Sequence, residues 1–207
     1  MPEKVLMDWK NDNGEHFESH AEDFLRPIYP WLLRDLENAT ERSVRGMKIL
    51  ELGCGPGFML EQFLAAHAKK VVGLDLSHKM LLRARNSGRA GTAQLIQADA
   101  CNLPFITESF DIVFSRGSVF FWNDIEQAMH QIKNILKPSG TALIGGGYGL
   151  STPQVYIDAI IQHYALQPKS KIPRLDFTIL QAIANKIGGK TEILQAKKRG
   201  FWLKWQI

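Results

Sequence analysis

Short apolar runs and segments with helical spacing alternate along the middle of the chain. The apolar runs predict five strands, at residues 47–52, 71–76, 93–97, 110–115 and 141–144. The spacing between them predicts helices over 58–68, 78–86 and 123–136. The runs are continuously apolar rather than alternating, which is typical of strands covered on both faces. The pattern therefore predicts a parallel α/β sheet with helices on both sides.

The segments before and after this core do not alternate between apolar runs and helical spacing. Before it, the polar segment 1–14 precedes two short helices, at 15–24 and 28–37, which we expect to be broken near Pro27 and Pro30. A charged connector at 41–46 leads into the first strand. After it, we expect helices over 153–164 and 177–187, a basic loop at 167–174, and a β-hairpin at 191–196 and 201–207 that turns at 197–200.

Composition excludes several classes of protein and leaves others open. The chain has 207 residues, 45% of them hydrophobic, which is enough for a sizeable core. The net charge of +4 permits a nucleic-acid partner without requiring one. Cys54 and Cys101 form neither a disulfide framework nor a zinc-binding spacing. With no apolar core in residues 1–10 and no apolar run near the ~18 residues of a membrane span, we expect no signal peptide, no membrane contact and a cytoplasmic protein.

A glycine-rich bend joins the first predicted strand to the helix after it. The run Glu51–Gly57 reads ELGCGPG, and its glycines allow a tight turn and close approach to a ligand. The amides at the start of the next helix favour an anionic group such as a carboxylate or phosphate. Asp75 ends the second strand, where a carboxylate can accept hydrogen bonds from ribose hydroxyls. The alternatives are a turn that binds nothing, and a helix N-terminal role for Asp75.

A third polar landmark follows the third strand. Asp99 can accept from the exocyclic amine of adenine, and the amide of Ala100 can donate to a ring nitrogen. Leu76, Met80 and Leu103 are candidates for the apolar faces of the ring. The alternative for Asp99 is a side chain that caps a turn. Taken together, the bend and the two carboxylates predict a nucleoside-sized cleft at the carboxyl edge of the sheet.

These residues resemble the class I S-adenosylmethionine-dependent methyltransferases. The resemblance covers about half of the chain, from Lys48 to Gly147, and is carried by the ordered motifs ILELGCGPG, VGLDLS, LPF, SFDIV and LKPSGT. It implies a doubly wound, mostly parallel seven-stranded, Rossmann-like sheet with a C-terminal antiparallel hairpin and N-terminal helices. We therefore expect one domain, 1–207. Its parts are a helical extension (1–45), a cofactor-binding core (46–147), a substrate-side insert (148–190) and a terminal hairpin (191–207).

The resemblance also implies a role for each matching residue toward S-adenosyl-L-methionine. The bend would hold the methionine part, with Glu51 orienting the bend or reaching the amino group. Asp75 would bind the ribose, Asp99 and Ala100 the adenine, and Ser115 and Arg116 would flank the methionine carboxylate and the sulfonium. The cofactor-binding residues expected in full are Glu51, Gly53, Cys54, Gly55, Asp75, Leu76, Met80, Asp99, Ala100, Ser115 and Arg116.

The methyl acceptor would lie beside the end of the fourth strand. Aromatic side chains there could wall an apolar pocket, or could instead pack the following helix. The substrate-side candidates are Ser118, Phe120, Phe121, Trp122 and Tyr148. In-line methyl transfer needs little covalent help from the protein, so no catalytic residue is assigned. The Asn/Asp-Pro-Pro-Tyr/Phe motif of amino-group methylases is absent, which favours a small-molecule acceptor.

Three rival interpretations remain open. Basic residues at Lys169, Lys171, Arg174 and 197–199 leave an RNA methyltransferase possible, and the absence of an obvious base leaves a non-catalytic cofactor-binding subunit possible. A nicotinamide oxidoreductase is disfavoured, because Phe58 stands where its third glycine would be. His16 and His20 have metal-binding spacing but no evident third ligand, so no metal is expected. The sequence does not indicate an oligomeric state.

Overall fold

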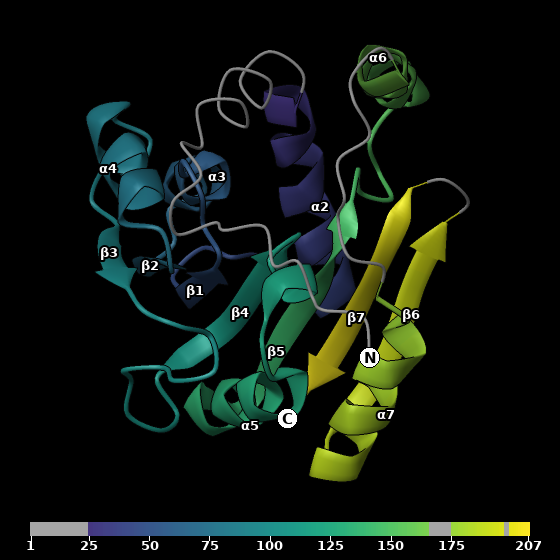
Figure 1. Ribbon diagram of the computed structural model, residues 1–207. Helices are drawn as coiled ribbons and strands as arrows, with labels where there is room; N and C mark the ends of the chain where they lie inside the picture. The colour runs from purple at the N-terminus through teal and green to yellow at the C-terminus, as the bar shows by residue number, and fades with distance from the viewer. Residues whose placement is uncertain (1–24, 166–174, 197–198) are drawn as a thin grey trace.

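A seven-stranded sheet forms the centre of the computed structural model, which describes residues 25–165, 175–196 and 199–207 (Figure 1). The strand order is β3-β2-β1-β4-β5-β7-β6. Strands β1 to β5 pair in parallel, and β7 runs antiparallel to both of its neighbours. The strands are β1 (Lys48–Leu52), β2 (Lys70–Asp75), β3 (Gln94–Gln97), β4 (Phe110–Arg116), β5 (Leu136–Gly147), β6 (Lys190–Ala196) and β7 (Gly200–Gln206).

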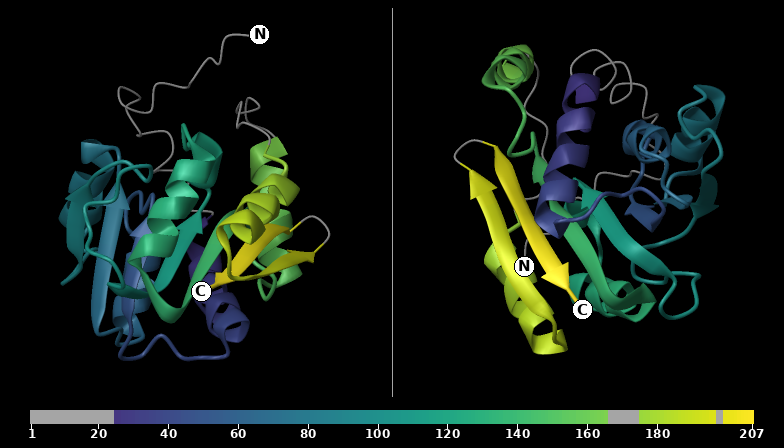
Figure 2. Two further views of the ribbon diagram at one scale, coloured as in Figure 1. Left: turned by 90° about the horizontal axis from the view of Figure 1, so that it is seen from below. Right: turned by 180° about the vertical axis from the view of Figure 1, so that it is seen from behind.

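Helices cover both faces of the sheet (Figure 2). In chain order the helical elements are η2 (Arg26–Ile28), α2 (Tyr29–Thr40), α3 (Phe58–Ala65), α4 (His78–Asn86), η3 (Val119–Phe121), α5 (Ile125–Ile135), α6 (Gln154–Ala165) and α7 (Phe177–Ile187). Helices α2 and α3 lie on one face, and α5 and α7 lie on the other (Figures 1 and 2). Within the described residues no helix is long and apolar enough to cross a membrane.

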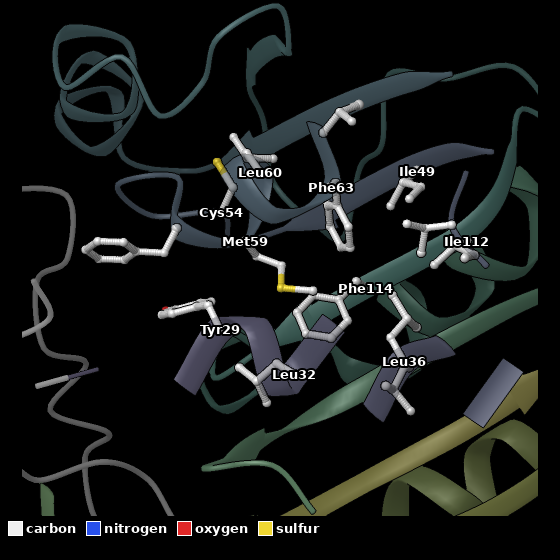
Figure 3. Close-up of a cluster of buried hydrophobic side chains, with 14 of the residues drawn as sticks. Tyr29, Leu32, Leu36, Ile49, Cys54, Met59, Leu60, Phe63, Ile112 and Phe114 are labelled. Atoms are coloured by element: carbon white, nitrogen blue, oxygen red, sulfur yellow. The ribbon is translucent and has the colours of Figure 1, made fainter. Parts of the chain in front are cut away.

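Neighbouring residues of each inner strand contribute to opposite cores, as the continuous apolar runs predict. Ile49 of β1 belongs to the cluster under α2 and α3, which contains Phe63 and Phe114 (Figure 3). Leu50, the next residue, belongs to the cluster under α5 and α7. Burial on both faces explains why these strands lack alternating polar positions. The predicted fold class is confirmed, including the antiparallel C-terminal pair.

Two element predictions were wrong in their details. Pro30 does not break the helix predicted at 28–37, because it lies in the first turn of α2, where the missing N–H is tolerated, and Pro27 lies in the short η2 that precedes α2. The structure extends the strand predicted at 141–144 back to Leu136, so that β5 contains the Pro138-Ser139-Gly140 segment. A bulge accommodates it: the pairing with β4 shifts after Phe110, and Ser139 takes a left-handed φ of 63°. The predicted helix at 15–24 and loop at 167–174 lie outside the described residues.

Candidate functional site

The bend between β1 and α3 lies at the carboxyl edge of the sheet. It is next to the switch point of the topology, where the chain order runs from β1 to β2 and β3 on one side and from β4 to β5 on the other. Gly53, Gly55 and Gly57 take left-handed φ values of 69°, 51° and 88°, which favour glycine. The amides of Gly53 and Cys54 both donate to the Leu74 carbonyl, at 2.7 and 3.0 Å. These bonds hold the bend against the end of β2.

Asp75 faces this bend, as the sequence predicts. Its Oδ2 accepts from the Gly55 amide at 2.8 Å, and its Oδ1 accepts from the Ser77 amide at 2.8 Å. Burial raises the pKa of Asp75, although these amides partly lower it. The carboxylate thus orders the bend, and its role toward ribose remains a prediction.

Glu51 is a buried acid at the floor of the same region. It is 4% exposed, and its Oε2 has no hydrogen-bond partner among the described residues. Burial raises the pKa of Glu51 well above its ordinary value, the neighbouring Asp75 raises it further, and Arg116 acts in the opposite direction. A buried acceptor without a partner costs about 1–3 kcal/mol, so this oxygen is suited to a ligand's hydrogen-bond donor.

Cys54 contributes to the site through its backbone. Its side chain is 4% exposed and belongs to the core cluster, beside Leu60 in Figure 3. A Cβ on Gly73 would lie 2.9 Å from the Cys54 sulfur, so the bend packs closely against β2 there. Burial raises the pKa of this thiol, and the acids Glu51 and Asp75 raise it further. The thiol therefore stays protonated and packed.

Arg116 ends β4 beside these acids. Its Nε donates to the Gly147 carbonyl at 3.1 Å, and its Nη1 donates to the Tyr29 hydroxyl at 3.3 Å. The guanidinium also lies 5.3 Å from the centre of the Tyr29 ring. A cation fixed in this way from α2 and β5 is placed to receive an anionic group.

The two serines near the end of β4 bond to each other. Their hydroxyl oxygens are 2.7 Å apart, and Ser118 donates to the Leu52 carbonyl at 3.0 Å. Ser115 is fully buried. Both hydroxyls therefore have partners inside the protein, and direct contact with a ligand remains a prediction for each.

The adenine-side candidates gather near the ends of β2 and β3. Asp99 Oδ1 accepts from the Cys101 amide at 2.9 Å, which is the turn-capping interaction that the sequence left as an alternative. Ala100, Met80 and Leu103 are buried, whereas Leu76 is 41% exposed. Their contact with adenine remains a prediction.

The substrate-side aromatics have packing roles. Phe120 lies at 6.1 Å from Phe201, edge to face, and its ring would lie 3.0 Å from a Cβ on Gly146. Phe120 and Trp122 pack against the core under α5 and α7, and Tyr148 packs against the other core. Phe121 is half-buried. Burial raises the pKa of Tyr148 and Arg116 lowers it, so the phenol is protonated at neutral pH.

Sequence reasoning missed a clamp on the segment that follows β5. Asp35, buried in α2, accepts from the amides of Leu150 and Ser151. Arg199 donates to the carbonyls of Leu150 and Thr152 from the other side. The available signal was an acid on the apolar stripe of α2, since Asp35 stands between Leu32 and Leu36 on the buried face.

The basic residues and the histidine pair noted in the sequence do not form a described site. Arg199 is not part of a free basic patch, because its guanidinium binds main-chain carbonyls. The other basic candidates, and His16 with His20, lie outside the described residues. In the part of the chain that is described, no three metal-ligating side chains come together.

A cavity of about 360 Å³ lies away from the bend. It is lined at the amino ends of β2 and β3 by residues that include Lys70 and Gln94. The bend adjoins the opposite ends of these strands. Asp75 stands five positions after Lys70 on β2, a distance of about 16 Å at the rise of a strand. This cavity is therefore separate from the candidate site.

Comparisons with known proteins show a similarity to methyltransferases. A family model described as a methyltransferase domain matches residues 50–144. The malonyl-[acyl-carrier protein] O-methyltransferase of Legionella pneumophila is 29% identical over 135 residues, 63% of this chain and 48% of that protein. The O-methyltransferase rstn1 of Aspergillus nomiae is 30% identical over 138 residues, 60% of this chain and 58% of that protein. The chain thus spans about half the length of the curated relatives it matches.

A solved structure extends the similarity to nearly the whole fold. A protein of Methanococcus maripaludis, described as an S-adenosyl-L-methionine-dependent methyltransferase, aligns with a TM-score of 0.83. The alignment covers 95% of this chain and 93% of that one, at 24% identity. The matched motifs, the strand order and the glycine bend agree with one another, and all three are similar to those of the class I S-adenosylmethionine-dependent methyltransferases.

Proposed function

We propose that this protein binds S-adenosyl-L-methionine at the glycine bend and transfers its methyl group to a small-molecule acceptor by in-line displacement. The observation that carries the proposal is the buried Glu51 carboxyl, whose Oε2 has no hydrogen-bond partner among the described residues. The cofactor has an ammonium group that can supply the missing donor. When bound, it supplies a methyl group already activated by the adjacent sulfonium.

Glu51 and Arg116 have the charges that an amino-acid group requires. Ionised Glu51 would hold the ammonium, and Arg116, fixed by Gly147 and Tyr29, would hold the carboxylate. Asp75 would accept from the ribose hydroxyls while it keeps its bonds to the bend. Asp99 and Ala100 would hold the adenine beside the exposed Leu76. These residues would position the cofactor, and positioning is the main contribution that such a displacement needs from a protein.

The acceptor side would be formed by the ends of β4 and β5 and by the insert at 148–190. Supporting this, Asp35 and Arg199 fix the start of the insert beside Tyr148, next to Arg116. A protonated Tyr148 can orient an acceptor by donating a hydrogen bond, but it is not a base at neutral pH. We also propose that the chain is a single domain, with the helical extension, cofactor-binding core, insert and terminal hairpin expected from the sequence.

The acceptor class is supported by the named relatives, two of which are O-methyltransferases. Cys54 and Cys101 are free thiols, which is compatible with the reducing cytoplasmic setting that we propose. An RNA acceptor has less support, because Arg199, the one candidate basic residue that is described, binds main-chain carbonyls.

Methyl transfer to separated acceptor pools tests the proposal. The protein is incubated with cofactor labelled in its methyl group and with either a metabolite extract or total RNA, and Asp75→Ala serves as the cofactor-site control. We expect label in the metabolite fraction with the wild type and little with the variant. Label found only in the RNA fraction would show that the acceptor is RNA and not a small molecule. Cofactor binding without label in either pool would identify a non-catalytic subunit.

A further inference from the structure

Strands β1 and β4 separate at the floor of the candidate site. Their paired residues end at Glu51 and Phe114, one residue before β1 itself ends. The next carbonyl of β1, that of Leu52, accepts from the Ser118 hydroxyl at 3.0 Å. A side chain thus continues the link between the strands beyond the last paired residues.

The direction of these hydrogen bonds is fixed by counting protons. Ser118 has one hydroxyl proton, and it is donated to Leu52. The 2.7 Å contact between the two serines must therefore use the proton of Ser115. Ser115 is fully buried in β4, and its hydroxyl therefore donates to the Ser118 hydroxyl from inside the protein.

Ser118 also contacts the bend and begins the next segment. A Cβ on Gly53 would lie 2.3 Å from the Ser118 Cβ, so these two residues are in direct contact. The Ser118 carbonyl accepts from the Phe121 amide at 2.9 Å, which closes the η3 turn. One residue therefore joins the end of β1 to the turn that carries Phe120 and Phe121.

We propose that Ser118 is a positioning residue that sets the glycine bend for the amino-acid part of the cofactor. The inference rests on the proposed function and adds a residue that acts through Leu52 and Gly53 rather than by transferring a proton. Without the hydroxyl, the Leu52 carbonyl loses its donor and the bend loses its link to β4. The nucleoside part should be affected much less, because Asp75 keeps its bond from the Ser77 amide even if its Gly55 partner shifts, and Asp99 keeps its bond from the Cys101 amide.

Two ligands separate this positioning role from a general loss of structure. S-adenosyl-L-methionine carries the amino-acid part, and 5′-methylthioadenosine carries the nucleoside and lacks it. Calorimetry with Ser118→Ala should show S-adenosyl-L-methionine binding about three- to tenfold weaker, the size expected for one lost hydrogen bond, with 5′-methylthioadenosine binding weakened much less. Ser115→Ala, which removes the supporting donor, should weaken the same ligand by a smaller factor.

Ser109→Ala is the matched control. The Ser109 hydroxyl also donates to a main-chain carbonyl, that of Ile106 at 2.7 Å, but it lies at the opposite end of β4. This variant should bind both ligands as the wild type does. Equal weakening of both ligands by Ser118→Ala, or no change in either, would overturn the inference. A wild-type protein that binds neither ligand would instead overturn the proposed function and, with it, this inference.

Discussion

The carboxyl edge of the sheet holds an acidic side chain in a buried position, which costs stability unless a partner offsets its charge. Glu51 is 4% exposed and lies beside a second acid, Asp75. The bend glycines and Asp75 could be predicted from the sequence, because their types and spacing follow from the backbone they must build. The Ser118 bond to Leu52 could not, because it depends on where two strands separate in space.

The first prediction concerns the pH dependence of stability. Since folding raises the pKa of Glu51, the stability linked to this group is fully present below its unfolded pKa of about 4.3 and is lost as pH rises through its folded pKa. Glu51→Gln should remove this loss, so the variant should gain stability relative to the wild type as pH rises from about 4.3 toward neutrality. Urea unfolding across this range measures the effect. Parallel pH profiles for the two proteins would contradict it.

A second prediction compares two glycines with left-handed φ. Gly53→Ala should lower the free energy of unfolding by about 1–2 kcal/mol through its φ of 69°. The added Cβ would also clash with Ser118, whose Cβ would lie 2.3 Å away. Gly46→Ala has a similar φ of 76° and nothing within 4 Å of its added Cβ. We expect Gly53→Ala to lower the free energy of unfolding by about 1–3 kcal/mol more than Gly46→Ala, a cost typical of overpacking. Equal losses in denaturant unfolding would show that the contact with Ser118 is unimportant.

At the scale of elements, sequence periodicity predicts the bounds of those helices that local residues begin and end. The helices at 78–86 and 177–187 match their predicted bounds, because each has a polar N-cap, Ser77 or Asp176. The extent of β5 was missed, since its bulge at Ser139 depends on pairing with β4 and on contact with Ile207. The clamp on the segment after β5 was missed for the same reason, because Asp35 lies 115 residues from Leu150.

A third prediction tests this clamp. Asp35→Ala leaves the amides of Leu150 and Ser151 without their acceptor, which should cost about 1–3 kcal/mol of stability. Hydrogen exchange should quicken at residues 148–153 more than in the sheet. Asp158→Ala is the control, because Asp158 is exposed on α6 and accepts only from Gln154 among the described residues. Unchanged exchange at 148–153 in the Asp35 variant would contradict the assignment.

At the scale of the whole molecule, one sheet joins two apolar cores that lie on its opposite faces. Trp202 and Trp205 of β7 are both fully or almost fully buried, one in each core. The two-sided burial could be predicted from the apolar runs. Which helix covers which face could not be predicted from periodicity, because with right-handed connections it depends on the order of the strands in the sheet.

A fourth prediction follows from this shared sheet. Leu60→Ala in α3 removes a fully buried side chain and should cost about 2–5 kcal/mol. Because both cores share the sheet, tryptophan fluorescence, to which Trp202 and Trp205 contribute, and far-ultraviolet circular dichroism should shift together in denaturant unfolding. A shift in the circular dichroism signal alone would show that the two cores unfold independently.

The central claim is that the glycine bend and its carboxylates form one cofactor site, and calorimetric titration with S-adenosyl-L-methionine tests it most directly. The wild type should bind one equivalent. Asp75→Ala should bind at least about tenfold more weakly, because it loses both a charged acceptor for the ligand and the bond that orders Gly55. A wild type that does not bind, or a variant that binds equally well, would contradict the account.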